Sequence, residues 1–291
     1  MTAFPAIDPK LVALVTAISF GLNPVTLKMG FGKGGRPDTA MIIGLFIAVP
    51  VYLVILPFGG GLNWEQVTVA AFVGYVLGGL FGTGIGRRWL YISIDRIGAS
   101  PATAIKNSAP VITTFLAAWL YQEEVTPIRW LAVAGIVVGV VLVTWRPGQG
   151  IRHWFDIGVL AAVGAALSYG VRPLFLKFGL EAANLPLTAA FVGAIAALAY
   201  ALLFGDRSGL LNARREPAFG LFLVSGVLQA IGFLALSLGL SGGDVSVVYP
   251  VTASAPLFTL LFTALLLRGR ERLTWRIVAG SVAIVLGVIV L

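Results

Sequence analysis

The chain has 291 residues, of which 58% are hydrophobic and only 11% charged, and its mean hydropathy is +0.97. Soluble domains carry roughly 25% charged residues, so this composition excludes an ordinary soluble protein and predicts an all-α integral membrane protein. The formal charge of +8 does not indicate nucleic acid as a partner, because the basic residues gather at the ends of apolar segments, where they face lipid headgroups.

Apolar runs of about 20 residues, enough to cross roughly 30 Å of hydrocarbon, follow one another with short polar breaks. They predict ten transmembrane helices. In chain order these cover residues 9–31, 37–58, 64–91, 98–121, 127–145, 156–178, 185–204, 217–240, 245–267 and 274–291. A polar linker lies at residues 146–155, between the fifth and sixth of these helices.

The two halves of the chain repeat one another with a period of about 147 residues. The segment SFGLNPVTLK at 19–28 matches SYGVRPLFLK at 168–177, since a serine, an aromatic residue, a glycine, a proline, a leucine and a lysine keep their places. Ser-Ala-Pro at 108–110 recurs at 254–256. We therefore expect two repeats, residues 1–148 and 149–291, that form one structural unit.

Each repeat holds five helices, an odd number, so the second repeat must cross the membrane in the opposite sense to the first. Inverted repeats are typical of secondary transporters, whose binding sites lie near the middle of the membrane between the repeats. The fold class predicted is therefore an all-α membrane protein with ten helices in two inverted five-helix repeats.

This arrangement resembles the EamA-type drug/metabolite transporter superfamily. The resemblance rests on the Ser-Ala-Pro segments of the fourth and ninth helices, an acidic residue in the loop after each (Glu123 and Glu271), and glycine-spaced fifth and tenth helices. It implies a basket of helices around a central cavity, with alternating access, and substrates such as amino acids or other small metabolites, often exported.

Residues 98–121 hold the most informative polar group of the chain. Lys106, Asn107 and Ser108 interrupt an apolar segment, and a cation at the centre of a bilayer costs about 2.5 to 3.5 kcal/mol unless it faces protein or water. We expect Lys106 and Asn107 to line a substrate pathway. The alternative is that Lys106 binds carbonyls freed near Pro110 and braces a broken helix.

Arg172 occupies the position in the second repeat that Asn23 holds in the first. It either extends to an interface or lines the same cavity as Asn23. If Lys106 and Arg172 both face inward, the site is electropositive and suits a carboxylate or a phosphate. The other predicted lining residues are Tyr169, Thr83, Gln229, Tyr249, Thr252 and Ser254.

Five prolines are predicted to kink helices near this pathway, and each leaves backbone carbonyls that need protein or water as partners. They are Pro24, Pro110, Pro173, Pro250 and Pro256. All twelve acids lie at or near segment ends, which disfavours coupling through a buried carboxylate. Facilitated transport, or proton uptake by Lys106 or Glu123, stays open. The chain carries no P-loop motif, and no cofactor or metal is expected.

Lys and Arg predict the orientation, because their excess in short loops marks the cytoplasmic side. Loops after odd-numbered helices hold fifteen of them, including Arg87 and Arg88, whereas the termini and the other loops hold three. Both termini are then expected outside, although members of the resembled family are often thought to have cytoplasmic termini. The expected location is a bacterial inner membrane.

The sequence leaves three functional hypotheses. The first is a secondary transporter that exports amino acids or related amphiphiles. The second is an intramembrane enzyme or carrier acting on phosphorylated or lipid-linked substrates. Its weakness is that the chain offers no evident acid or histidine for proton transfer. The third is a membrane scaffold. We expect no enzymatic activity; the partners expected are a small-molecule substrate and lipid, with the chain as a monomer or a homodimer.

Overall fold

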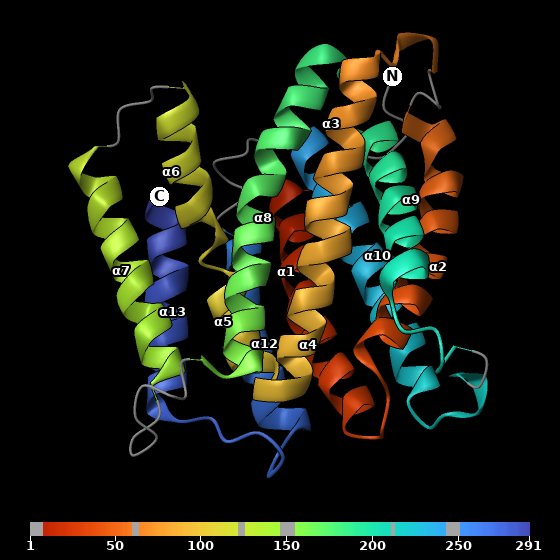
Figure 1. The fold of residues 1–291 in the computed structure, drawn as a ribbon. Coiled ribbons are helices and arrows are strands. Elements are labelled where there is room, and N and C mark those ends of the chain that lie inside the picture. Colours follow the sequence, from red (N-terminus) through yellow and green to blue (C-terminus); the bar gives the residue numbers. More distant parts are fainter. Residues whose placement is uncertain (1–7, 60–63, 122–125, 146–154, 211–212, 243–250) are drawn as a thin grey trace.

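The computed structural model describes residues 8–59, 64–121, 126–145, 155–210, 213–242 and 251–291, and every regular element among them is a helix (Figure 1). The first half contains α1 (Pro9–Phe31), α2 (Pro37–Ile55), α3 (Val69–Gly79), α4 (Arg87–Ile97), α5 (Ala99–Lys106), α6 (Ala109–Tyr121) and α7 (Pro127–Thr144). The second half contains α8 (Ile157–Ala182), α9 (Pro186–Phe204), α10 (Phe219–Gly242), α12 (Ala255–Leu266) and α13 (Trp275–Val290).

Six helical segments of the described chain are long and apolar enough to cross a membrane. They are Lys10–Phe31, Pro37–Ile55, Val69–Ile97, Pro127–Thr144, Ile157–Ala182 and Pro186–Phe204. Shorter apolar helices cover Phe219–Ala235, Val251–Leu266 and Trp275–Val290. The prediction of an all-helical, multi-pass chain is therefore confirmed, whereas the count of ten spans stays a prediction.

The predicted helix over residues 64–91 is wrong at both ends. The helix begins at Val69 and continues to Ile97 through α3, a π-helical segment (Leu80–Gly86) and α4. It ends only at Gly98, whose φ of 104° is accessible to glycine and turns the chain into α5. Arg87 and Arg88 therefore lie inside the helix and do not belong to the loop charges that predict the orientation.

The segment over residues 98–121 is two helices with a break between them. Asn107 and Ser108 form the turn between α5 and α6, and the Ser108 hydroxyl donates to the carbonyl of Ile105 at 2.7 Å. The second repeat breaks at the same place, since Ser254 precedes α12 and its hydroxyl donates to the carbonyl of Val251 at 2.6 Å. The repeated Ser-Ala-Pro segments thus encode the same broken helix twice.

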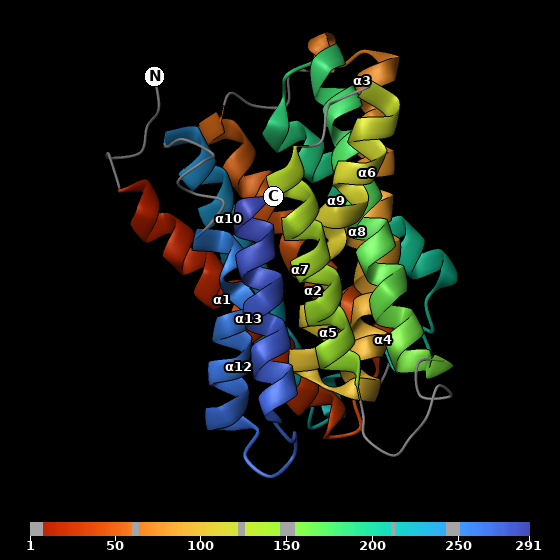
Figure 2. The ribbon, with the colours of Figure 1, turned by 90° about the vertical axis from the view of Figure 1, so that its left-hand side faces the viewer.

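Reciprocal contacts join the two repeats. In one, the Thr113 hydroxyl of α6 donates to the Gly170 carbonyl of α8 at 2.8 Å; in the other, the Thr259 hydroxyl of α12 donates to the Gly21 carbonyl of α1 at 3.1 Å. Figure 2 shows that α1 and α8 run in opposite directions, as do α6 and α12. The contacts and directions are those of two inverted repeats.

Helices α7 and α13 pack against each other at the edge of the molecule (Figure 1). A methyl group on Gly139 would lie 2.7 Å from the Gly280 carbonyl, and one on Gly287 would lie 2.9 Å from the Ala132 carbonyl, so the glycines allow a close approach. The outer face remains apolar, and Leu131 is 72% exposed. These helices therefore form a tight pair with one lipid-facing side.

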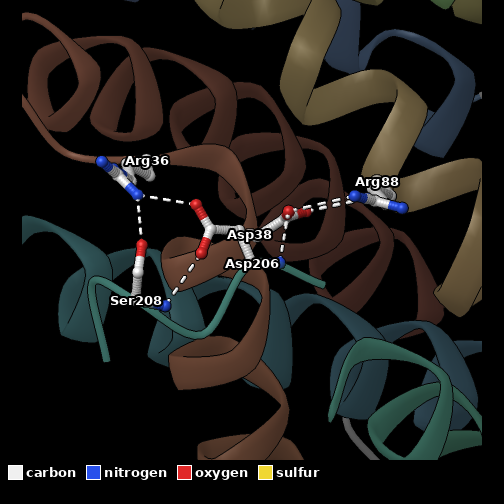
Figure 3. A network of polar contacts seen from close by, with 5 residues as sticks. All are labelled: Arg36, Asp38, Arg88, Asp206 and Ser208. Atoms are coloured by element: carbon white, nitrogen blue, oxygen red, sulfur yellow. Dashed lines mark hydrogen bonds and ion pairs between the residues drawn. The ribbon is translucent and has the colours of Figure 1, made fainter. Parts of the chain in front are cut away.

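A polar network links the loops at the end of the molecule where α1, α4, α7, α9 and α12 finish, which we call the basic end (Figure 3). The Asp38 carboxylate accepts from Arg88 at 2.8 and 3.1 Å and from the backbone amide of Asp206 at 2.8 Å. Arg36 donates to the Asp206 carboxylate at 2.6 Å and to the Ser208 hydroxyl at 2.5 Å. The network joins the first half to the second.

Candidate functional site

The break between α5 and α6 places polar side chains in the interior of the protein. Residues Ala99 to Ile105 are all buried, whereas Lys106, Asn107 and Ser108 keep partial exposure. Helix α5 is thus fully packed, and three polar residues with partial exposure lie at its C-terminal end. This is the position at which the sequence predicts a substrate pathway.

Lys106 contacts a residue of the other repeat. Its ammonium group lies 5.1 Å from the centre of the Tyr169 ring of α8, a cation–π distance, and donates to the Asn107 side-chain oxygen at 2.9 Å. The structure thus brings together three predicted site residues, Lys106, Asn107 and Tyr169. Among the described residues, the hydrogen-bond partner of Lys106 is this side chain and not a backbone carbonyl near Pro110.

Arg172 lies between the π-helical segment and α10. A methyl group on Gly82 would come within 2.8 Å of the Arg172 Nε atom, so this glycine makes room for the guanidinium stem. The guanidinium carbon lies 5.7 Å from the centre of the Phe233 ring. Arg172 is half-buried and lies within electrostatic range of Lys106. Arg172 of the second repeat thus packs between Gly82 of the first repeat and Phe233 of α10.

Arg87 is a buried cation, although the sequence predicts it in a loop. Its side chain is only 3% exposed, and its Nη1 atom has no hydrogen-bond partner among the residues that the structure describes. Both Arg87 and Arg172 lie within electrostatic range of the Tyr52 hydroxyl on α2. The pair Arg87-Arg88 after a glycine-rich run is typical of a helix end, and this pattern concealed a buried arginine.

The π-helical segment lies beside Arg87 and Arg172. It lies directly before Arg87, and α8 packs against it, with Phe81 and Phe175 stacked at 5.3 Å between centroids. A π turn widens the helix and is frequent at functional sites. It also carries Thr83, a predicted lining residue, which is half-buried.

Asn23 differs from its partner in the repeat. Its side chain is 4% exposed and donates to the Ser225 carbonyl at 2.7 Å and the Ser225 hydroxyl at 2.9 Å, so it ties α1 to α10. Equivalent positions of the two repeats thus hold a helix contact in one case and a half-buried arginine in the other. The remaining described candidates, Gln229, Thr252 and Ser254, are half-buried, and Tyr249 lies outside the described residues.

The prolines act in two ways. Pro24 and Pro173 lie inside α1 and α8, at equivalent positions. Pro110 and Pro256 lie at the starts of α6 and α12, where the missing N–H costs little, so the predicted kinks there are helix breaks. Pro250 lies outside the described residues.

Two half-chains with reciprocal contacts and equivalent helix breaks have the architecture of a multi-pass membrane transporter built from inverted repeats. A model of the EamA-like transporter family matches residues 10–145 and again residues 156–291. The chain therefore belongs to the EamA-like transporter family, and the predicted two-repeat architecture is confirmed.

Comparison with solved structures supports the fold alone. One protein, described only as a crystal structure, aligns over 98% of this chain and 98% of its own with a TM-score of 0.60 and 19% sequence identity. No curated protein matches the chain in sequence.

Proposed function

We propose that the chain is a secondary transporter that exports small polar metabolites bearing a carboxylate, in particular amino acids and related amphiphiles. The observation that carries the proposal is the contact of Lys106 with Tyr169 at the α5–α6 break, where one repeat presents a cation to an aromatic ring of the other. An amine in this position is available to a solute that enters between the repeats.

The chemistry around the break suits an anionic group attached to an apolar body. Lys106, Arg172 and Arg87 supply positive charge, and charge-assisted hydrogen bonds to a carboxylate are the stronger class. Tyr169 and Phe233 supply aromatic surface beside these cations. A carboxylate then binds at the cations while the rest of the solute packs on the rings.

Alternating access would use the inverted relation of the repeats. Thr113 and Thr259 hold the α6–α8 and α12–α1 contacts in the same way, so the two pairs can exchange roles as the halves rock against each other. The polar network of Figure 3 joins the halves at the basic end, so a motion of the halves relative to each other would change the contact between Arg36 and Asp206.

The test is solute flux into proteoliposomes that contain the purified full chain. The panel holds amino acids, other carboxylates and phosphate esters, and empty liposomes are the blank. Saturable flux of amino acids supports the proposal. Flux of phosphate esters alone would favour a carrier of phosphorylated substrates, and a flat panel would contradict transport of both kinds.

We further propose that the termini face outward in a bacterial inner membrane, since the charge bias persists without Arg87 and Arg88. The chain works as a monomer or a homodimer with lipid and its solute as partners. A reporter fused after Leu291 that is active only outside the cytoplasm should be active. Activity of a reporter that works only in the cytoplasm would reverse the orientation.

A further inference from the structure

A cavity opens at the basic end, away from the α5–α6 break. Its volume is about 690 Å³, within the range of small-ligand sites, and it is formed by the ends of α1, α4 and α7, the α12–α13 loop and the start of α13. Its charged lining consists of Lys28, Arg96, Arg270, Arg272, Arg276 and a single acid, Glu271.

The acid in this cavity is already engaged. The Glu271 carboxylate accepts hydrogen bonds from the backbone amides of Ala99 at 2.8 Å and Ser100 at 2.9 Å. These amides are the first of α5, where the helix dipole favours negative charge. Glu271 therefore fixes the start of α5, and its charge is offset there.

The arginines of the cavity are not neutralised by carboxylates of the described residues. Of the described residues, none forms an ion pair with Arg96, Arg270, Arg272 or Arg276. Lys28 donates to the Asp95 carbonyl at 2.5 Å, a neutral partner that leaves its charge in place. The cavity thus concentrates positive charge that the protein itself does not balance.

Two tryptophans place this cavity at the level of the membrane interface. Trp145 and Trp275 line it and are 55% and 67% exposed. Tryptophan prefers the headgroup region of a bilayer, so the cations lie where lipid phosphates lie. Ile97, Val143 and Ile277 add apolar surface to the same wall. Figure 2 shows the lower ends of α7, α12 and α13 grouped there.

We propose that this cavity binds the phosphate group of an anionic phospholipid. The phosphate is held by Arg96, Arg272 and Arg276, because guanidinium groups bind phosphate oxygens in pairs. The acyl chains leave the cavity along Trp275 and the apolar wall. Basic pockets between membrane helices bind anionic headgroups by this combination of charge and depth. The bound lipid would bridge the α4–α5 turn of the first repeat and the α12–α13 loop of the second.

The experiment measures binding of fluorescent phosphatidylglycerol and of fluorescent phosphatidylcholine to the detergent-purified full chain. We expect phosphatidylglycerol to bind at least about tenfold more tightly, and the double variant Arg96→Gln/Arg276→Gln to lose that preference. The matched control is Arg207→Gln/Arg214→Gln, which removes two exposed arginines from loops at the same end but outside the cavity. It should bind as the parent does.

A charge-retaining variant separates loss of binding from loss of fold. Arg96→Lys/Arg276→Lys should retain most of the preference for phosphatidylglycerol. The unfolding temperature of each variant is measured, and only variants that unfold at the temperature of the parent are compared. Inorganic phosphate is the competing probe: displacement only at far higher concentration identifies the lipid as the source, whereas displacement at equal concentration assigns the site to a soluble phosphate. Equal losses in the cavity and control variants, or equal binding of both lipids, would overturn the proposal.

Discussion

The ammonium group of Lys106 lies 5.1 Å from the centre of the Tyr169 ring. The two residues come from different repeats, and the lysine ends α5 where the helix breaks. A cation over an aromatic face gains about 0.5 to 2 kcal/mol, so the ring fixes the amine at the meeting point of the repeats. The position of the charge is thus set by the contact between the repeats.

Transport by Tyr169 variants should depend on whether the aromatic ring is kept and not on the hydroxyl. Tyr169→Phe keeps the aromatic face, and we expect flux close to that of the parent. Tyr169→Leu removes the face, and KM should rise by about 2- to 30-fold, the equivalent of the cation–π energy. Initial rates in proteoliposomes give both values. Equal behaviour of the two variants would show that the ring does not position Lys106.

The glycines at the reciprocal contacts should be intolerant of a methyl group. In Gly170→Ala the new methyl would lie 2.8 Å from the Ala109 carbonyl, and in Gly21→Ala 2.9 Å from the Ala255 carbonyl. Overpacking of this kind costs about 1 to 3 kcal/mol, so both variants should unfold at lower temperature in detergent.

The control for these variants is Gly135→Ala in α7, where the added methyl meets nothing within 4 Å. Alanine is the better helix former by up to about 1 kcal/mol, so this variant should unfold at the same temperature as the parent or above it. If Gly21→Ala and Gly170→Ala were as stable as Gly135→Ala, the inference that the repeats approach closely at these two glycines would be wrong.

The sequence predicts most of the fold because the signals are local. Asp8 followed by Pro9 starts α1 at the predicted residue, and the Asp8 carboxylate accepts from the Lys10 amide at 2.9 Å. The repeated Ser-Ala-Pro segments predict equivalent structure in the two halves. That structure proved to be a helix break, because each serine hydroxyl bonds to a backbone carbonyl three residues earlier.

The site was predictable only in part. Lys106 is conspicuous because it interrupts an apolar run, but its contact with Tyr169 depends on how α8 packs against the break. Arg87 shows the limit most clearly. Two arginines after a glycine-rich segment predict an interface, and only the π-helical segment and the ion pair of Arg88 with Asp38 explain why the helix continues past them.

The network at the basic end should be insensitive to pH in the neutral range. Hydrogen bonds from Ser208, with Arg36 nearby, hold the pKa of Asp206 below its ordinary value of 3.8. Its stabilising contribution is therefore complete above pH 3.8 and is lost as the pH falls through the lower value of the folded protein.

The measurement compares the parent with Asp206→Asn by thermal unfolding in detergent. Their difference should be small, because both partners are exposed, and constant between about pH 7 and 5. It should shrink only below pH 3.8. A difference that disappears already at about pH 6 would mean that the charge of Asp206 is not held by this network.

The central claim is that Lys106 binds the transported anion, and flux of the preferred amino acid through Lys106→Met tests it most directly. Loss of a hydrogen bond to a charged group predicts a fall in kcat/KM of about 10- to 150-fold. The control, Lys33→Met, makes the same change at an exposed loop position and should transport as the parent does. Equal flux through the two variants would contradict the account.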